Sequence, residues 1–332
     1  MAGHNVTASA RPPGRENVVV CEVSLRDGIQ GWPTVLRTEE KIRILRAVQD
    51  AGVREIDATS FVRPGPIPQF TDAEAVLAAI DSGVRLRVLA PNLRGADRVV
   101  EAHRRVRPID MCGIPFSASE PHNLANLHRD HASHKAEITY MAETLRQAGV
   151  EPFVCIATAF GCPIQGEVST DTVVDLAGWV YSLGMRTVMF GDTTGVGDPV
   201  RVNDLFLRAT REWPDVRFLA HFHDNRGLGL ANTLAAIGAG AAAVSGGEVS
   251  GSRAAAGIAG GVVGWEGNAG GWGGRGERGA GGCAGFKSAR ELISFYAAVL
   301  TRRPVPSSLP PMPLACWKAA LRSWANWSWE TP

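Results

Sequence analysis

The chain has 332 residues, which is long enough for one barrel-sized domain or for two smaller ones. Its 34 basic and 33 acidic residues leave a net charge of +1, so the charge balance argues against a nucleic-acid or membrane partner. No apolar run approaches the roughly 20 residues that are needed to span a bilayer.

The N-terminal residues 1–16 are polar, contain Arg and Pro, and lack the apolar centre of a signal peptide. We expect them to form a disordered lead-in. Six cysteines occur without CxxC spacing, at Cys21, Cys112, Cys155, Cys162, Cys283 and Cys316. This usage predicts reduced thiols and a cytoplasmic protein.

Apolar, β-branched runs alternate with helical patterns between residue 17 and about residue 249. The runs that predict strands lie at 17–23, 53–61, 85–91, 107–116, 150–160, 185–191, 216–223 and 241–245. The first helical pattern, at 38–45, has a capping threonine, early acidic residues and apolar spacing of three and four. Further helices are expected at 71–82, 93–105, 131–148, 169–183, 199–213 and 227–239. Glycine follows several of them, at Gly52, Gly83, Gly149 and Gly184.

Eight strands with seven intervening helices predict an α/β fold, a closed (β/α)8 TIM barrel with an irregular glycine-rich C-terminal region. A doubly wound open sheet is the structural alternative, and eight even repeats favour closure. The expected organisation is a catalytic barrel over 17–300, an atypical glycine-rich loop at 246–285 within it, and a Pro- and Trp-rich tail at 301–332.

Polar residues interrupt the apolar runs where the predicted strands end. They lie at 26–27, 57–60, 91–92, 117–120, 158, 192–194 and 221–224. In a barrel the C-terminal ends of the strands form one rim, and active sites lie there. We therefore expect these residues to converge on a single site.

The motif His221-Phe222-His223-Asp224 ends one of the apolar runs. Residues two apart on a strand point to the same side, so both imidazoles face one point, which suits a divalent metal. If Asp27, after the first strand, meets them in space, the result is a two-histidine, one-carboxylate site with Arg26 beside it. Each motif alone also has an ordinary reading, as two half-buried histidines and as an Arg-Asp-Gly turn.

Seven segments resemble the 3-hydroxy-3-methylglutaryl-CoA lyase family, within the wider group of metal-dependent barrel lyases, aldolases and condensing enzymes. They are EVSLRDGIQ (22–30), IDATSFV (56–62), LAPNLRG (89–95), SASE (117–120), FGCP (160–163), GDTTGVG (191–197) and HFHD (221–224). They follow the family's order and cover residues 17 to about 240. The first and last mark only the wider group, whereas IDATSFV, LAPNLRG and FGCP are similar to the lyase branch.

The resemblance implies that Asp27, His221 and His223 bind Mg²⁺ or Mn²⁺, with an asparagine from beyond strand 8 as a fourth ligand. The metal would hold the hydroxyl and an oxygen of a short branched hydroxyacyl-CoA and lower the hydroxyl's pKa. Arg26 would stabilise the enolate oxygen that forms as the carbon–carbon bond breaks. Asp57 or Asp192 would orient Arg26 or relay the proton. The family usually has glutamate at the position of Asp57, so its reach is one methylene shorter here.

Gln30, Asn92, Ser119 and Thr158 are candidate substrate-binding residues on the same rim. Ordinary hydrogen bonding within the loops is an equally good reading of these residues. A polar cluster of His122, His128, His131 and His134 follows the fourth predicted strand. Its mixed spacing is typical of a solvated loop and a helix start, so we assign none of it to metal.

The family pattern fails after about residue 245, where residues 246–285 hold 17 of the chain's 38 glycines. Two segments resemble the family's cysteine loop. Residues 279–283 end in Cys283 but lie far from His223, whereas 257–262 fit the distance better, have valine in place of cysteine, and lead to Asn268. Cys283 is thus a candidate acid and Asn268 a candidate metal ligand. A lid insertion, a shifted reading frame and a diverged paralogue all remain open for this stretch.

The leading functional hypothesis is a metal-dependent lyase that converts a 3-hydroxy-3-methylglutaryl-CoA-like thioester into acetyl-CoA and acetoacetate. The alternatives are a Claisen-type condensing enzyme or a pyruvate aldolase of the same group, and a catalytically impaired paralogue that binds a CoA ester. The resemblance also allows a homodimer, because family members are often dimers.

Overall fold

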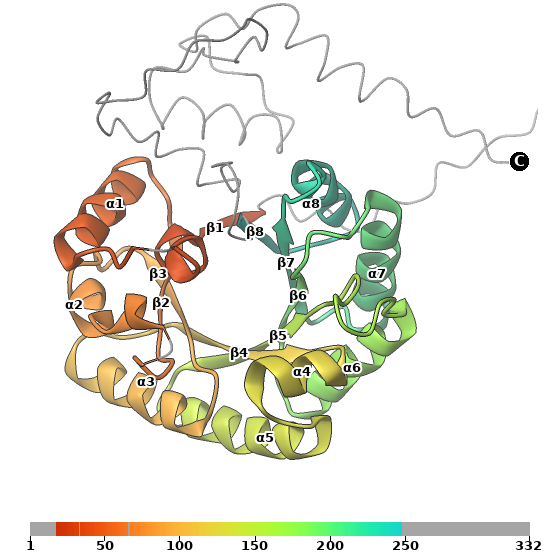
Figure 1. Ribbon diagram of the computed structural model, residues 1–332, viewed down its shortest axis with the longest axis horizontal. Coiled ribbons are helices and arrows are strands. Elements are labelled where there is room, and N and C mark those ends of the chain that lie inside the picture. The colour runs from red at the N-terminus through yellow and green to blue at the C-terminus, as the bar shows by residue number, and fades with distance from the viewer. Residues whose placement is uncertain (1–17, 33, 66, 248–332) are drawn as a thin grey trace, which may run out of the picture. The chain divides into compact units, whose positions relative to one another are not determined.

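The computed structural model describes residues 18–32, 34–65 and 67–247. They form a closed barrel of eight strands in the order of the sequence, with every neighbouring pair parallel (Figure 1). The strands are β1 (Val19–Glu22), β2 (Glu55–Ser60), β3 (Arg85–Leu89), β4 (Met111–Ser117), β5 (Glu151–Ala157), β6 (Thr187–Asp192), β7 (Arg217–His223) and β8 (Ala243–Gly247). The barrel closes where β1 pairs with β8, with Val19 opposite Ala243. The closed barrel is confirmed, and the open-sheet alternative is wrong.

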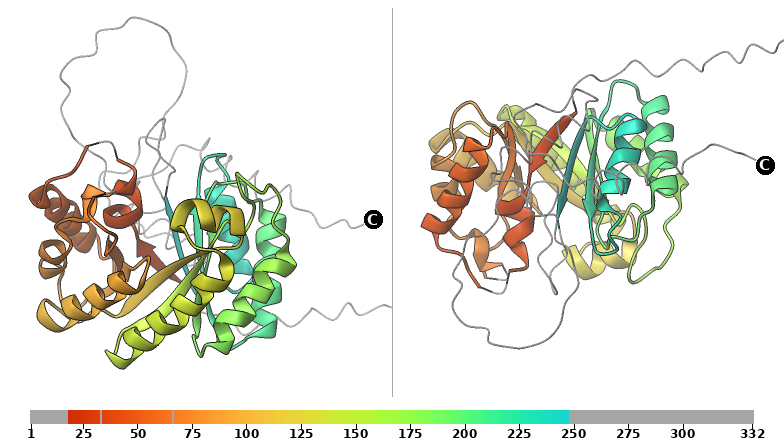
Figure 2. Two further views of the ribbon diagram at one scale, coloured as in Figure 1. Left: turned by 60° about the horizontal axis from the view of Figure 1, so that its bottom comes forward. Right: turned by 90° about the horizontal axis from the view of Figure 1, so that it is seen from above.

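Helices surround the strands, as Figure 2 shows from two further directions. They are α1 (Thr38–Asp50), α2 (Ala73–Ala78), α3 (Leu93–Arg105), α4 (Glu120–Leu127), α5 (His131–Gln147), α6 (Thr170–Ser182), α7 (Pro199–Glu212) and α8 (Gly229–Gly238). A π-helix, η1 (Ser24–Gly28), follows β1, and a 3-10 helix, η2 (Pro68–Phe70), precedes α2. None of the helices in the described ranges is long and apolar enough to cross a membrane.

Side-chain caps explain why several helices begin where they do. The side chain of the N-cap residue accepts a hydrogen bond from a backbone N–H of the first turn in α3, α4, α5, α6 and α7. Each cap satisfies one of the four N–H groups that a helix start leaves without a partner, at about 1 kcal/mol per cap. The start of α3 at Leu93 agrees with the prediction to the residue.

Several local expectations are wrong. Thr38, expected to cap the first helix, is the first residue of α1, and Arg37 holds the N-cap position. The segment after β4, expected to be a solvated loop, contains helix α4, which Ser119 caps and whose first turn holds Glu120. The polar cluster is also not uniformly solvated, because His134 in α5 is fully buried and its ring packs 5.4 Å from that of Phe116. The Ser119 cap and the buried Asn123 side chain, which accepts from Ser117 N at 3.0 Å, hold α4, whereas ring packing against Phe116 holds His134. Helix α2 is shorter than the expected 71–82.

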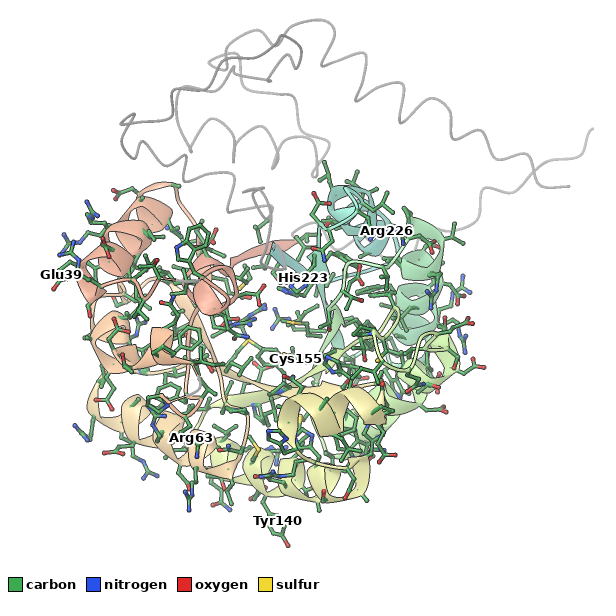
Figure 3. The ribbon with its side chains drawn as sticks, viewed as in Figure 1. Glu39, Arg63, Tyr140, Cys155, His223 and Arg226 are labelled. Atoms are coloured by element: carbon green, nitrogen blue, oxygen red, sulfur yellow. The ribbon has the colours of Figure 1, made fainter. Side chains whose placement is uncertain are left out.

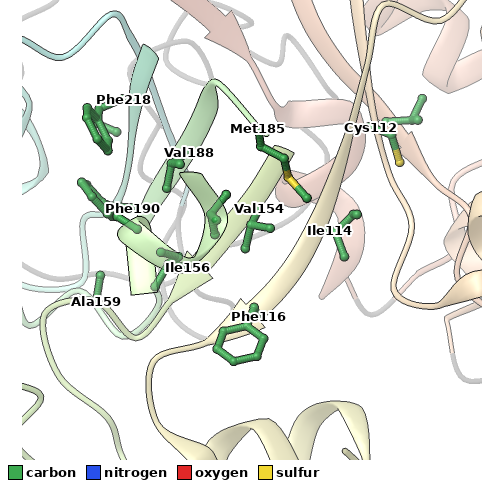
Figure 4. Packing of buried hydrophobic residues seen from close by; sticks show 14 of the residues in the cluster. Cys112, Ile114, Phe116, Val154, Ile156, Ala159, Met185, Val188, Phe190 and Phe218 are labelled. Carbon is green, nitrogen blue, oxygen red and sulfur yellow. The ribbon is translucent and has the colours of Figure 1, made fainter. Parts of the chain in front are cut away.

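The hydrophobic core has an outer layer between strands and helices and an inner layer inside the barrel. Figure 4 shows part of the outer layer, in which Phe190 stacks on Phe218 with ring centroids 5.3 Å apart. The inner layer consists of Met111, Phe153, Met189, Leu219 and Ala243. Burial of each large apolar side chain contributes roughly 1.5–3 kcal/mol. On β7, Leu219 lies two residues before His221, so the inner layer forms the floor beneath the two histidines.

Several expectations concern residues outside the described ranges. They are the lead-in at 1–16, the tail at 301–332, most of the glycine-rich loop, and the candidates Asn268 and Cys283. At the near edge of that loop, Gly246 and Gly247 are the last residues of β8 and not loop residues.

Candidate metal and catalytic site

Asp27, His221 and His223 meet at the mouth of the barrel, although Asp27 and His223 are 196 residues apart in sequence. Asp27 Oδ2 lies 3.2 Å from His223 Nε2 and 3.4 Å from His221 Nε2. The two Nε2 atoms are 3.1 Å apart, and the three candidate ligand atoms all lie within 4.8 Å of one another. Figure 3 shows His223 at the opening of the barrel.

Local structure aims these three side chains. On β7 the strand alternation turns His221 and His223 to the same side, while Phe222 between them is buried in the outer core. Asp27 is in the π-helix η1, whose wide turn is closed by the Gly28 N–H bonding to the Val23 carbonyl. Single π turns of this kind occur frequently at functional sites.

Hydrogen bonds behind the histidines direct both Nε2 atoms toward the carboxylate of Asp27. His223 Nδ1 donates to the Thr193 carbonyl at 2.8 Å. His221 Nδ1 lies 3.0 Å from Ser245 Oγ, and that hydroxyl donates to the Ala220 carbonyl at 3.3 Å, so it accepts from His221. In the neutral form each ring therefore presents the lone pair of Nε2. Two nitrogen lone pairs and a carboxylate that converge on one point fit a divalent cation.

The charges at the site shift the pKa values of its groups. The pKa of Asp27 is well below its usual range, because Arg26 and the two histidines together outweigh the effect of burial. Burial lowers the pKa of His221. Burial also disfavours the charged form of His223, but the hydrogen bond to Asp27 and the charge of Asp27 outweigh that effect and raise the pKa of His223. An ionised Asp27 and a neutral His221 suit metal binding, whereas a cation would have to displace the proton that Asp27 favours on His223.

Arg26 is held between two carboxylates. Its Nε donates to Asp57 Oδ2 at 2.6 Å, and its Nη1 donates to Asp27 Oδ1 at 2.9 Å. Arg26 as a whole residue is only 8% exposed. Because Nε and Nη1 are occupied, Nη2 is the nitrogen that remains for a substrate oxygen. The structure brings Arg26 and Asp57 together with the candidate metal ligands.

Asp192 lies at the end of β6 and is 1% exposed. Its two oxygens accept from the backbone N–H groups of Val196 at 2.9 Å and Gly197 at 3.0 Å. Burial raises the pKa of Asp192, although these two bonds and the nearby histidines act in the opposite direction. The carboxylate therefore fixes the β6–α7 loop beside the histidines.

The four candidate substrate-binding residues have different surroundings. Gln30 is exposed. Asn92 caps α3 by accepting from Gly95 N, and Ser119 is fully buried and caps α4. Thr158 is fully buried, has a φ of 54°, and bonds to Ser117 Oγ at 2.8 Å. None of the hydrogen bonds that these four make in the described ranges reaches Arg26 or the candidate metal ligands, and their substrate role stays a prediction.

Sequence reasoning missed the residues that support the histidines. Ser245 is the register partner of His221, which places a polar residue beside the first histidine once β7 and β8 are paired.

Cys155 lies inside the barrel, where Figure 3 shows it (labelled) near the centre. Burial raises its pKa to about 12, so it is a neutral thiol. The four cysteines in the described ranges are all free.

Comparison with known proteins agrees with this geometry. The family model HMGL-like matches residues 17–262. The chain is 31% identical over 227 residues to the hydroxymethylglutaryl-CoA lyase YngG of Bacillus subtilis, covering 68% of this chain and 74% of that protein. It is also 31% identical over 231 residues to the mitochondrial hydroxymethylglutaryl-CoA lyase of Homo sapiens, covering 69% and 70%.

Solved structures give the same answer. An HMG-CoA lyase from Acinetobacter baumannii, in complex with coenzyme A and 3-methylmalate, is 37% identical with a TM-score of 0.64, covering 69% of this chain and 74% of that one. The HMG-CoA lyase of Bacillus subtilis is 30% identical with a TM-score of 0.66, covering 71% and 78%. The candidate metal-ligand cluster at the barrel mouth agrees with the matching family model and with relatives that are carbon–carbon lyases. The chain belongs to the HMGL-like family.

Proposed function

We propose that this protein is a divalent-metal-dependent lyase that cleaves 3-hydroxy-3-methylglutaryl-CoA, or a close analogue, into acetyl-CoA and acetoacetate. The observation that carries the proposal is the convergence of Asp27, His221 and His223 beside the buried cation Arg26. Relatives named as HMG-CoA lyases support the substrate class, and one of them was solved with coenzyme A.

Asp27, His221 and His223 would hold the metal. When bound, a Mg²⁺ or Mn²⁺ ion supplies a Lewis acid that lowers the pKa of the substrate's tertiary hydroxyl. Mixed nitrogen and oxygen ligation accepts either ion. Asn268, outside the described residues, remains a prediction for a further ligand.

Arg26 would stabilise charge on the thioester oxygen. Once the hydroxyl has lost its proton, its electron pair forms the new ketone of acetoacetate while the carbon–carbon bond breaks. The electrons of that bond move onto the acetyl-CoA fragment as an enolate, which is then protonated at carbon. A fixed guanidinium with Nη2 free lowers the energy of that developing oxyanion without reorganisation. Two carboxylates, on Asp57 and Asp27, restrict its rotation.

Asp192 and Asp57 are the candidates for relaying the proton in the described part of the chain. Asp192 lies next to the histidines, and burial raises its pKa, which favours a role in proton transfer. Its two backbone hydrogen bonds hold it in one orientation. We propose Asp192 as the proton relay and Asp57 as the residue that orients Arg26. Cys283, outside the described residues, stays a prediction for the acid.

The test is release of acetyl-CoA from 3-hydroxy-3-methylglutaryl-CoA by chelated protein, with and without added Mn²⁺, in parallel with Mn²⁺ binding followed by electron paramagnetic resonance. We expect turnover only with metal, and loss of both turnover and binding in His223→Ala. His128→Asn is the matched control, because His128 is a C-cap with a φ of 55°, which asparagine tolerates, and lies away from the ligand cluster.

The outcomes separate the alternatives. Metal binding without cleavage, but with condensation of acetyl-CoA or release of pyruvate, would replace the lyase by a condensing enzyme or an aldolase. Binding of metal and CoA ester without any turnover would indicate an impaired paralogue. A homodimer and a cytoplasmic location stay predictions, which sedimentation and cell fractionation would check.

A further inference from the structure

A line of alternating charge runs down the inside of the barrel from the candidate metal site. Below Arg26 and Asp57 lie Arg87 of β3 and Glu55 of β2, whose side chains are each only 2% exposed. Arg87 Nη2 is ion-paired with Glu55 Oε1. The proposed reaction uses neither residue, and a buried ion pair in the floor of a barrel is costly compared with apolar packing.

The strand register places Arg87 beside Asp57. Asp57 pairs with Arg87 across β2 and β3, while Glu55, two residues earlier on β2, pairs with Arg85. Residues two apart on a strand face the same side, so the carboxylates of Asp57 and Glu55 both point into the barrel. Arg87 thus lies between two interior carboxylates, one of which holds Arg26.

Complementary groups of Asp57 and Arg87 lack hydrogen-bond partners. Asp57 Oδ2 accepts from Arg26, but its Oδ1 is buried without a partner. Arg87 Nε is likewise buried without a hydrogen-bond partner. An unsatisfied acceptor and an unsatisfied donor on adjacent strand residues are matched in chemistry, and a buried polar group that stays unpaired is costly.

Other groups around Asp57 do not replace Arg87. Two thiols near Asp57 also face this interior, those of Cys21 on β1 and Cys155 on β5, and burial raises the pKa of each to about 12. Glu55 has a second cation, because Arg85 Nη1 lies 3.8 Å from its Oε2. The guanidinium of Arg87 also lies 5.7 Å from the ring of Phe153, within cation–π range. Neutralising Glu55 is therefore not its sole role.

We propose that Arg87 is a positioning residue that donates to the free oxygen of Asp57, directly or through one water, and thereby fixes the carboxylate that aims Arg26. Asp57 is then held from both sides, by Arg26 above and by Arg87 below. A carboxylate held at both oxygens cannot rotate, so Arg26 keeps Nη2 directed to the substrate oxygen. The catalytic consequence rests on the proposed lyase function, whereas the positioning of Arg26 does not.

The test compares Arg87→Met, Arg87→Lys and the double variant Glu55→Gln/Arg87→Met with the wild type. The first readout is independent of substrate: in ¹⁵N-arginine-labelled protein, the Nε–H signal of Arg26, assigned with Arg26→Lys, should exchange slowly with solvent. We expect the Arg26 Nε–H to exchange at least about tenfold faster in Arg87→Met, because tenfold corresponds to the free energy of one lost charge-assisted hydrogen bond. In Arg87→Lys the slow exchange of the wild type should return.

The second readout is the cleavage reaction. We expect kcat to fall about tenfold in Arg87→Met and in the double variant, with KM and the Kd for Mn²⁺ changed less than twofold. Arg87→Lys should regain most of kcat. Lys41→Met is the matched control, because the Lys41 side chain is 3% exposed and ion-paired with Asp72 at 2.7 Å between α1 and α2, away from the site. It should lower the melting temperature and leave kcat and the Arg26 exchange rate unchanged.

Two results would overturn the inference. The first is an Arg26 Nε–H exchange rate and a kcat in Arg87→Met that equal those of the wild type. The second is a double variant in which melting temperature, Mn²⁺ affinity and kcat all fall together, because that would indicate a structural role alone. If the wild type does not cleave the thioester but Arg26 exchange responds to Arg87→Met, the proposed function fails and the positioning role stands.

Discussion

Replacing Ser245 by alanine tests how the first histidine is prepared for metal. Ser245 Oγ lies 3.0 Å from His221 Nδ1, and the two side chains are buried, with residue exposures of 2% and 7%. In Ser245→Ala the Nδ1–H of His221 loses its acceptor in a place where little water can substitute. The ring can then move its proton to Nε2, which blocks the lone pair that would bind metal.

The magnitude follows from that geometry. Loss of a hydrogen-bond partner behind a metal-binding histidine typically lowers metal affinity about 10- to 100-fold, which corresponds to roughly 1.4–2.7 kcal/mol. The Ser245 bond is buried and close to ideal length, so we expect an increase in the Kd for Mn²⁺ within that range.

Calorimetric titration of metal-free protein with Mn²⁺ measures this effect without substrate. Ser169→Ala is the matched serine control: it removes the exposed cap of α6, should cost about 1 kcal/mol of stability, and should leave the Kd unchanged. A Kd for Ser245→Ala within twofold of the wild type would refute the tautomer argument.

Three further predictions concern the loop, the buried histidine and the metal. Gly195 has a φ of +64°, and an added Cβ would lie 3.0 Å from the His223 carbonyl oxygen. Gly195→Ala should therefore lower the free energy of unfolding in urea by about 1–3 kcal/mol and weaken Mn²⁺ binding. Unchanged values would contradict the strain argument. Burial lowers the pKa of His134 to about 4, below its ordinary value near 6.5, so its contribution is complete above pH 6.5 and is lost as the pH falls towards 4. The full loss is about 3 kcal/mol, and the unfolding free energy of His134→Phe should fall less steeply over that window than that of the wild type; equal slopes would count against it. Mn²⁺ at about 100 times its Kd should raise the unfolding free energy by about 2.7 kcal/mol in the wild type and not in His223→Ala, as thermal unfolding with and without metal will show.

Much of the barrel was predictable because its signals are local. The β-branched runs and the spacing of apolar residues identified all eight strands and located helix starts such as Leu93. The alternation along a strand also predicted that His221 and His223 share one side. These inferences needed only neighbours within a few residues.

Closure and register decided what local patterns could not. That Asp27 reaches His223 depends on η1 folding at the end of β1 and on β1 pairing with β8. Ser245 became relevant only because β8 places it opposite His221. The burial of His134 depends on packing against Phe116, which the polar sequence there does not indicate.

The buried charges show the same division most clearly. In the sequence, Glu55 and Arg87 stand near the starts of apolar runs, close to the charged residues Arg54 and Arg85, and nothing local distinguishes them from residues at an exposed strand start. The pairing of β2 with β3 brings Arg87 beside Asp57, and closure of the barrel removes both from water. The sequence by itself determined the strands, the helices and the residue types of the site. Only the tertiary structure decided which charges face one another, because contacts between distant residues depend on strand pairing and closure.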